Sequence, residues 1–169
     1  ADNNLSLVNQ TLTADNTARI GNGGGIYCNT ENGSLTLDGT AEIRGNQAGM
    51  EESDFGGHGG GICAVPCHIT LDVGSSIQDN KALQYGGGIS LAENSVLDVN
   101  GARILSNSAG KQGGGIWNHG GSTVHMEAGD ISLNTAAVGG GLYNDIGSQV
   151  YMTQAAAFGL TGFNTASSH

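Results

Sequence analysis

An internal repeat constrains the fold of this chain more than any other sequence feature. A glycine triplet followed by one apolar residue recurs at steps of 36, 27, 27 and 26 residues, and a second signature, Asn-x-Ala, recurs with it. The apolar residues after the triplets are Ile26, Ile62, Ile89, Ile116 and Leu142. The asparagines of the second signature are Asn16, Asn46, Asn80, Asn107, Asn134 and Asn164. A regular period of this length indicates a solenoid, a propeller or another repeat array.

Within each unit, apolar and polar residues alternate over short runs, which is typical of β-strands. One strand column is predicted from the segments 35–38, 69–72, 96–98, 124–127 and 150–153. A second column contains Ile43, Ile77, Ile104 and Ile131, each three residues before a repeat asparagine. The third strand column contains the residue that follows each glycine triplet. Each unit is therefore expected to hold three short strands and three turns.

We predict an all-β fold, a single-stranded right-handed parallel β-helix of about six rungs with three strands per rung. A short three-stranded unit can bury its apolar side chains only if each strand pairs in parallel with the same strand of the next unit. The right-handed coil follows from the general rule for parallel crossovers. The chain 1–169 is expected to form one domain, with units at approximately 5–22, 23–58, 59–85, 86–112, 113–138 and 139–169. Propeller blades are longer, and leucine-rich repeats need a different consensus.

Stacking of the units should place like residues over like residues, about 4.8 Å apart. The residues after the glycine triplets are then expected to form a buried apolar ladder. The repeat asparagines should form a second ladder at one corner, where their side chains satisfy backbone groups of the turn. The glycines would supply a positive φ or a close backbone approach at another corner.

The composition excludes several classes of protein. The chain has 31 glycines without a three-residue period and only one proline, which excludes collagen. Five basic residues stand against 15 acidic ones, a formal charge of −10, so we expect no nucleic-acid partner. No apolar run of about 18 residues is present, so we expect no membrane insertion by this chain. The start at Ala1 resembles the residue that remains after signal cleavage, which favours secretion.

Cys28, Cys63 and Cys67 are too few for a disulfide scaffold and lack the paired spacing of a zinc site. The sequence is compatible with one disulfide and one free thiol, and all three pairings remain open. The pairing of Cys63 with Cys67 would close a small loop.

The glycine motif, as in Gly-Gly-Gly-Ile-Tyr, and the motif Ile-x-x-Asn-x-Ala together resemble the repeats of polymorphic outer-membrane proteins and autotransporter passengers. The resemblance covers about 5–166. It implies a surface-exposed, adhesin-like passenger or stalk at a bacterial-type cell surface, secreted or extracellular. Its partners would be a protein or glycan of a host or neighbouring cell.

Four carboxylates, Asp38, Asp72, Asp98 and Glu127, fall in one column of this alignment. Like charges on successive rungs repel, so they either point into water or are bridged by cations. Calcium prefers oxygen ligands of this kind. A Ca²⁺ column is therefore a hypothesis beside the alternative of a solvated acidic face, and no other cofactor is expected.

An insertion follows Asn46, because the next glycine triplet starts 13 residues later, against 5 or 6 in the later units. Insertions in solenoids form loops on one face, and such loops often carry recognition. The predicted loop residues are Met50, Glu51, Glu52, Asp54 and Phe55. The alternative is a tolerated loop without a function.

Tyr27, Trp117 and Tyr143 each follow the apolar residue of a glycine triplet, so alternation directs them outward. Exposed aromatic side chains along one face suit contact with a carbohydrate or a protein. Ordinary surface packing is the alternative interpretation.

The sequence predicts no enzyme. Enzymatic β-helices gather carboxylates with a base or a second acid in a groove, and the five basic residues here are dispersed. We therefore expect a non-enzymatic, extracellular structural or adhesin-type module. Unpaired edges at the first and last rungs suggest one alternative, a subunit that stacks on further copies of itself end to end into an extracellular filament. A polysaccharide-binding or polysaccharide-degrading β-helix is the other.

Overall fold

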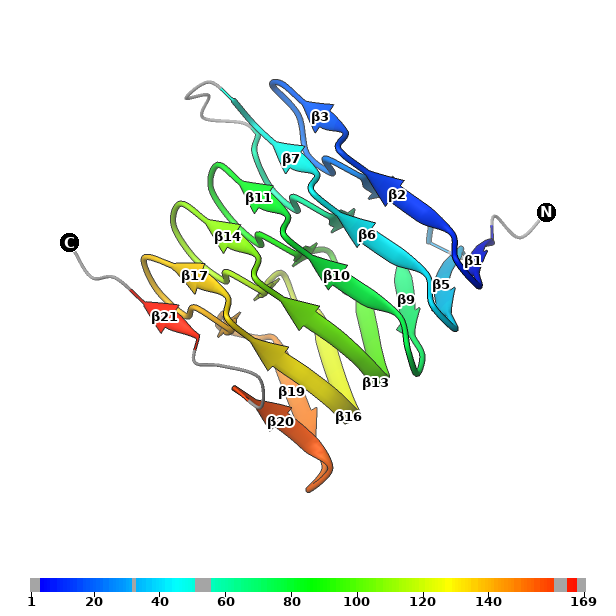
Figure 1. Cartoon of the computed structure of the whole chain (residues 1–169). Helices are drawn as coiled ribbons and strands as arrows, with labels where there is room; N and C mark the ends of the chain where they lie inside the picture. Colours follow the sequence, from blue (N-terminus) through cyan, green and yellow to red (C-terminus); the bar gives the residue numbers. More distant parts are fainter. Residues whose placement is uncertain (1–3, 32, 51–55, 160–163, 167–169) are drawn as a thin grey trace.

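The computed structural model describes residues 4–31, 33–50, 56–159 and 164–166. These residues form short β-strands joined by turns, and they contain no helix. Every strand pairing is parallel, and the chain winds through about six turns (Figure 1). The predicted all-β parallel solenoid is confirmed.

Each turn visits three sheets. The Ile sheet contains β4 (Ile26–Cys28), β8 (Ile62–Ala64), β12 (Ile89–Leu91), β15 (Ile116–Asn118) and β18 (Leu142–Asn144). The Asn sheet contains β3 (Thr17–Ala18), β7 (Gln47–Ala48), β11 (Lys81–Ala82), β14 (Ser108–Ala109), β17 (Thr135–Ala136) and β21 (Thr165–Ala166). The other ten strands form the large sheet.

The large sheet has two halves. The first contains β1 (Leu5–Val8), β5 (Ser34–Asp38), β9 (His68–Leu71) and β19 (Gln149–Met152). The second contains β2 (Leu12–Ala14), β6 (Glu42–Arg44), β10 (Ser76–Gln78) and β20 (Ala156–Phe158). In the middle of the solenoid, β13 (Val96–Leu105) and β16 (Thr123–Ser132) run through both halves as single strands.

The predicted three strands per rung occur in the two middle turns that contain β13 and β16, but they are not the three strands that the sequence assigned. The two columns expected as separate strands share one sheet and are continuous in β13 and β16, which pass a glycine with positive φ at Gly101 and Gly129. In addition, the Asn-x-Ala signature forms a two-residue strand of its own in every turn. The solenoid still has three sides, but one of them is formed by the Asn-x-Ala strands and not by the residues that the sequence assigned to it.

The core confirms the predicted apolar ladders. In the Ile sheet, Ile26, Ile62, Ile89, Ile116 and Leu142 pair in register from turn to turn. In the large sheet, Ile43, Ile77, Ile104 and Ile131 do the same. The isoleucines of the middle turns in both ladders are fully buried and belong to one hydrophobic cluster.

The glycine triplets are required by close contacts between turns. At Gly60, an added Cβ would lie 2.4 Å from the carbonyl oxygen of Gly87 in the next turn. At Gly59, φ is +64°, which side chains other than glycine rarely adopt. Both reasons recur along the column, which explains why the triplet is repeated.

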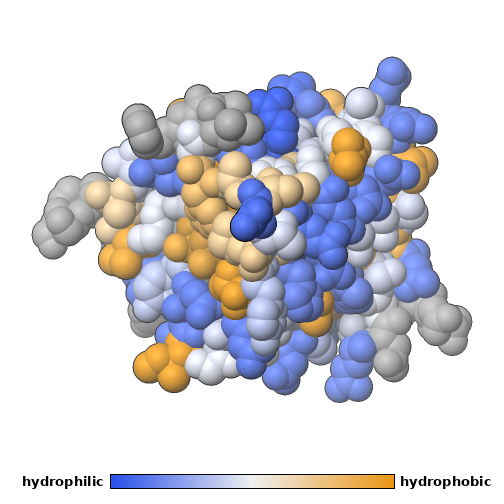
Figure 2. All heavy atoms as spheres, turned by 90° about the horizontal axis from the view of Figure 1, so that it is seen from below, coloured by the Kyte–Doolittle hydropathy of each residue, from blue (hydrophilic) through white to orange (hydrophobic). Residues whose placement is uncertain are grey.

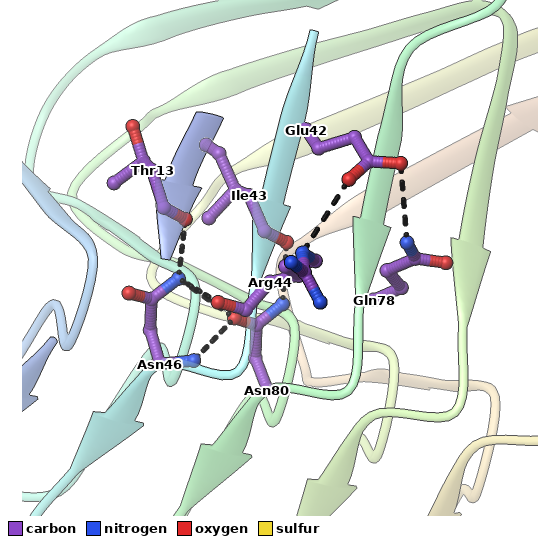
Figure 3. Close-up of polar contacts among 7 residues, drawn as sticks. All are labelled: Thr13, Glu42, Ile43, Arg44, Asn46, Gln78 and Asn80. Carbon is purple, nitrogen blue, oxygen red and sulfur yellow. Dashed lines mark hydrogen bonds and ion pairs between the residues drawn. The ribbon is translucent and has the colours of Figure 1, made fainter. Parts of the chain in front are cut away.

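The repeat asparagines form the predicted ladder, shown for two turns in Figure 3. The backbone N–H and the Nδ2 of Asn46 both donate to Oδ1 of Asn80, each at 3.0 Å. The same Nδ2 also donates to the carbonyl oxygens of Thr13 and Arg44. Asn80, Asn107 and Asn134 repeat the contact with the next turn and are almost fully buried. One amide per turn thus satisfies buried backbone groups that would otherwise destabilise the corner.

Candidate binding surfaces

The predicted acidic column does not form, because the alignment of one strand was wrong. Leu97 pairs with Ile69 and not with Leu71, so Asp98 lies level with Thr70 rather than with Asp72. Asp72 instead accepts a hydrogen bond from Nδ2 of Asn100 at 3.0 Å.

Glu127 also falls out of the predicted column. It lies at an irregularity of the pairing between β13 and β16, where Met126 pairs with Val99 and Ala128 pairs with Asn100. Asp38, Asp72, Asp98 and Glu127 are therefore not one file of carboxylates, and the observation that motivated a Ca²⁺ column is lost. Within the described residues, no group of three or more His, Cys, Asp or Glu side chains is arranged to hold a metal ion.

Asp98 is held by two histidines from neighbouring strands. Its Oδ2 lies 2.6 Å from Nε2 of His68 on β9, and its Oδ1 lies 2.9 Å from Nδ1 of His125 on β16. Partial burial raises the pKa of Asp98, but the hydrogen bonds and charges of the two imidazoles outweigh this effect and lower the pKa below its usual value. Tyr151 of the next turn stacks on His125, with 5.3 Å between ring centroids. This polar stack links four turns on the outer surface of the large sheet.

A second histidine and carboxylate pair lies at the turn after the Ile sheet. Nδ1 of His119 is 2.6 Å from Oδ2 of Asp145 in the next turn. The hydrogen bond from His119, with that from the backbone of Ile146, lowers the pKa of the exposed Asp145 carboxyl. In both places the histidines pair with carboxylates of a neighbouring turn and not with one another.

The predicted aromatic face is interrupted, and Trp117 does not lie exposed on it. Trp117 is only 8% exposed, and the rings of Tyr85 and His119 stack against its indole with centroids 4.5 Å and 4.6 Å away. His58 approaches its edge at 5.4 Å. The positions below it in the same column are Cys63 and Ser90, small buried residues over which the indole can lie. Trp117 therefore offers no free ring face to a sugar.

The other two predicted aromatics lie far apart along the solenoid. Tyr27 is 51% exposed on β4, and Tyr143 is partly buried on β18, with three turns between them. The packed cluster of Tyr85, Trp117 and His119 was not predicted as a cluster. The sequence predicts which column contains Trp117, but it does not predict which neighbouring side chains its ring contacts.

The predicted recognition loop is described only at its start. Met50 is 55% exposed, and its backbone N–H donates to the carbonyl oxygen of Arg19. Glu51, Glu52, Asp54 and Phe55 lie outside the described residues.

The three cysteines form one disulfide and one free thiol, and the structure selects one of the three open pairings. Cys28 on β4 is joined to Cys67, 39 residues later, at the turn that leads into β9. Cys63 is buried, and desolvation raises the pKa of its thiol to about 12. The free thiol is therefore inert at neutral pH, because only the thiolate is an effective nucleophile. The disulfide ties two neighbouring turns together at one end of the solenoid.

Both end turns expose apolar side chains. Leu5 and Leu12 are 47% and 51% exposed in the first turn, and Met152 and Phe158 are 46% and 44% exposed in the last turn. Figure 2, which looks at the molecule from below, shows apolar residues gathered in a patch at the centre of that side. Among the residues that the structure describes, the strands of the two end turns each have a partner on one side only.

A cleft of about 230 Å³ lies at the first turn and was not predicted from the sequence. It is lined by Leu5 of β1, by the three residues of β4, and by Asn29, Thr30, Ser34 and Leu35. Two of its walls are therefore the open edges of strands from two different sheets.

Among the described residues, no helix has the length and apolar character needed to span a membrane. Comparisons of the chain with protein-family models, with curated proteins and with solved structures found no match. The relation to outer-membrane and autotransporter repeats therefore stays a prediction from the motifs, and the functional argument rests on the geometry of the solenoid.

Proposed function

We propose that this protein is a rigid, non-enzymatic structural module of the adhesin type that works outside the cell, where it contacts a surface protein or a glycan. The observation that carries the proposal is the Cys28–Cys67 disulfide between successive turns. Disulfides form and persist in oxidising compartments and are rare in the cytosol. The acidic charge of −10 is compatible with a soluble surface exposed to the medium.

The repeated contacts between turns support a mechanical role. Buried asparagine and isoleucine ladders connect each middle turn to both of its neighbours. Such stacked repeats present long, rigid faces, which solenoid proteins use for binding. A rigid support also places an exposed loop or edge at a fixed height above a cell surface.

The first test is the redox state and location of the native protein. Peptide mapping without reduction should recover Cys28 linked to Cys67 and Cys63 as a free thiol. Antibody labelling of intact cells should detect the protein without permeabilisation, and an intracellular protein of the same cells serves as the control. Reduced Cys28 and Cys67 together with labelling only after permeabilisation would contradict the proposal.

Self-assembly end to end is a second candidate, favoured by the ends of the solenoid. The apolar columns continue to both ends, where Leu5 begins one column and Val150 ends it. In the asparagine ladder, each residue donates to Oδ1 of the next turn, so Oδ1 of Asn16 and the backbone N–H of Asn164 lie at opposite ends. A second copy in line would match acceptor to donor and apolar column to apolar column. Light scattering of the full chain over a range of concentrations should then show open-ended growth rather than a fixed monomer.

A further inference from the structure

Three asparagines outside the ladder stand in Asn-x-Ser/Thr, the acceptor sequence for N-linked oligosaccharides. They are Asn4, Asn9 and Asn32. No ladder asparagine has this sequence, because the second residue after each of them is alanine, as in Asn80-x-Ala82. The acceptor sequence is therefore separate from the asparagines that hold the turns together.

Asn9 presents a side-chain nitrogen that is open to modification. It lies in the turn between β1 and β2, where Asn9 and Gln10 are both exposed and have positive φ, +34° and +62°. Its Oδ1 lies against Gly39 of the second turn, in space that a Cβ at Gly39 would need. Within the described residues, Nδ2 of Asn9 makes no hydrogen bond. In contrast, Nδ2 of the buried Asn80 donates to two acceptors.

The other two acceptor sequences have less support. Oδ1 of Asn4 accepts hydrogen bonds from the backbone N–H and the hydroxyl of Ser34, at 3.2 Å and 3.1 Å, which hold this side chain against the second turn. Asn32 lies outside the described residues. Asn9 is therefore the position that the geometry favours.

Two exposed apolar side chains stand on either side of Asn9 along the chain. Val8 is 49% exposed and Leu12 is 51% exposed. Their partners in the second turn are Asp38 and Glu42, polar residues of the outer face of the large sheet. Val8 and Leu12 thus take outward positions that are polar in the next turn. Neighbouring exposed apolar residues often mark a surface that another group covers.

We propose that Asn9 carries an N-linked oligosaccharide that covers Val8 and Leu12. In its formation, Nδ2 of Asn9 attacks the anomeric carbon of an oligosaccharide carried on a lipid pyrophosphate. The C–N bond forms, the bond from the anomeric carbon to the phosphate oxygen breaks, and one amide proton is lost as the lipid pyrophosphate departs. Such a group is bulky and solubilising. The inference rests on the proposed extracellular role, because this modification is a property of secreted proteins.

The test uses the native protein, purified from the cells that produce it. Treatment with a peptide-N-glycosidase in heavy-oxygen water converts a glycosylated asparagine into an aspartate that carries the heavy isotope. Peptide mapping by mass spectrometry should find this label at Asn9 in the treated sample and not in the untreated one. The treated protein should also lose the mass of the oligosaccharide.

Two variants of Thr11 separate the acceptor sequence from the fold. Thr11→Ser keeps the hydroxyl that the acceptor sequence needs, so the oligosaccharide should remain. Thr11→Val keeps the branched shape but removes the hydroxyl, so the oligosaccharide should be lost. Thr11→Val also removes the hydrogen bond from Oγ1 to the carbonyl oxygen of Val8, and circular dichroism checks that it still folds. Asn9→Asp, which removes only the acceptor nitrogen, is a second variant that should lack the oligosaccharide.

Hydroxyl-radical labelling tests the covering of the apolar pair. Enzymatic removal of the oligosaccharide should increase the labelling of Val8 and Leu12. The control is Val138, which is also 49% exposed but lies beside the Ile sheet, and its labelling should not change.

An unmodified Asn9 in a protein that is detected on intact cells and keeps its Cys28–Cys67 disulfide would overturn this inference alone. An unmodified Asn9 in a reduced protein, detected only after permeabilisation, would overturn the proposed function as well. An oligosaccharide at another asparagine but not at Asn9 would contradict the assignment, as would unchanged radical labelling of the apolar pair.

Discussion

The middle and end turns of the solenoid use similar residues in the same columns but bury them very differently. Ile69 in the third turn is fully buried, whereas Leu5 in the same column of the first turn is 47% exposed. In the second half of the large sheet, Ile104 is fully buried and Phe158 is 44% exposed. Burial in this fold therefore comes from having a turn on both sides, and not from the residue itself.

The same contrast holds for the asparagine ladder. Asn107 donates to Asn134 and to the carbonyl oxygen of Ile77, and it accepts from Asn80. Asn16 in the first turn is exposed, and among the described residues its side-chain amide donates to Asn46 and accepts no hydrogen bond. A stability that decreases from the middle to the ends follows, since each repeat is stabilised by its nearest neighbours.

The largest expected effect is a truncation in the core. Ile69→Ala should lower the free energy of unfolding by about 2 to 5 kcal/mol, because it leaves a cavity between two turns. Leu5→Ala, at the open end of the same column, should lower it by less than about 1.5 kcal/mol. Urea unfolding followed by circular dichroism measures both. Equal losses would show that the end turn is covered in solution.

A smaller difference is expected in the ladder. Asn107→Ala leaves the buried backbone N–H of Asn80 without its partner and removes the hydrogen bond to the carbonyl oxygen of Ile77, which should destabilise the fold by about 1 to 3 kcal/mol. Asn16→Ala removes donors at an exposed position and should change stability by about 0.5 kcal/mol or less. Thermal unfolding of both variants at the same pH makes the comparison. A larger effect at Asn16 would contradict the gradient.

The smallest effect concerns pH at the histidine-bound Asp98. Its folded pKa lies below the usual value, so the folded state binds fewer protons and Asp98 stabilises the protein above about pH 4. This contribution should disappear as the pH falls through the folded pKa. Asp98→Asn should therefore flatten the decline of the melting temperature below about pH 4, whereas Glu31→Gln at an exposed position should leave the decline unchanged. Parallel curves for Asp98→Asn and the unchanged chain would refute the role of Asp98.

The fold was predictable because its two strongest signals are local and repeated. Glycine triplets and Asn-x-Ala mark corners where the backbone permits little else, so the residues next to them, such as Ile89 and Asn107, could be placed correctly. The segment at Val96 is farther from both signatures. Val96 and Leu97 are both apolar, so more than one register of this segment fits the buried column. No nearby signature in the sequence selects the observed register, in which Leu97 pairs with Ile69.

The candidate surfaces were less predictable because they depend on side chains that cross between turns. Trp117 lies in one column with Ser90 and Cys63, and its ring stacks on Tyr85. The position of a residue in a column does not predict such a contact. The hydrogen bonds of His68 and His125 to Asp98 also cross between turns. Periodicity predicts what recurs, whereas these features are single departures from it.

The asparagine ladder has one consequence for how such a protein can change in length. Every junction between turns uses the same donor and acceptor pair, as between Asn80 and Asn107 and between Asn107 and Asn134. Removing or duplicating a whole 27-residue unit would therefore recreate an existing junction rather than require a new one. The length of the rod can then vary through unequal recombination, while the chemistry of both ends of the rod stays constant.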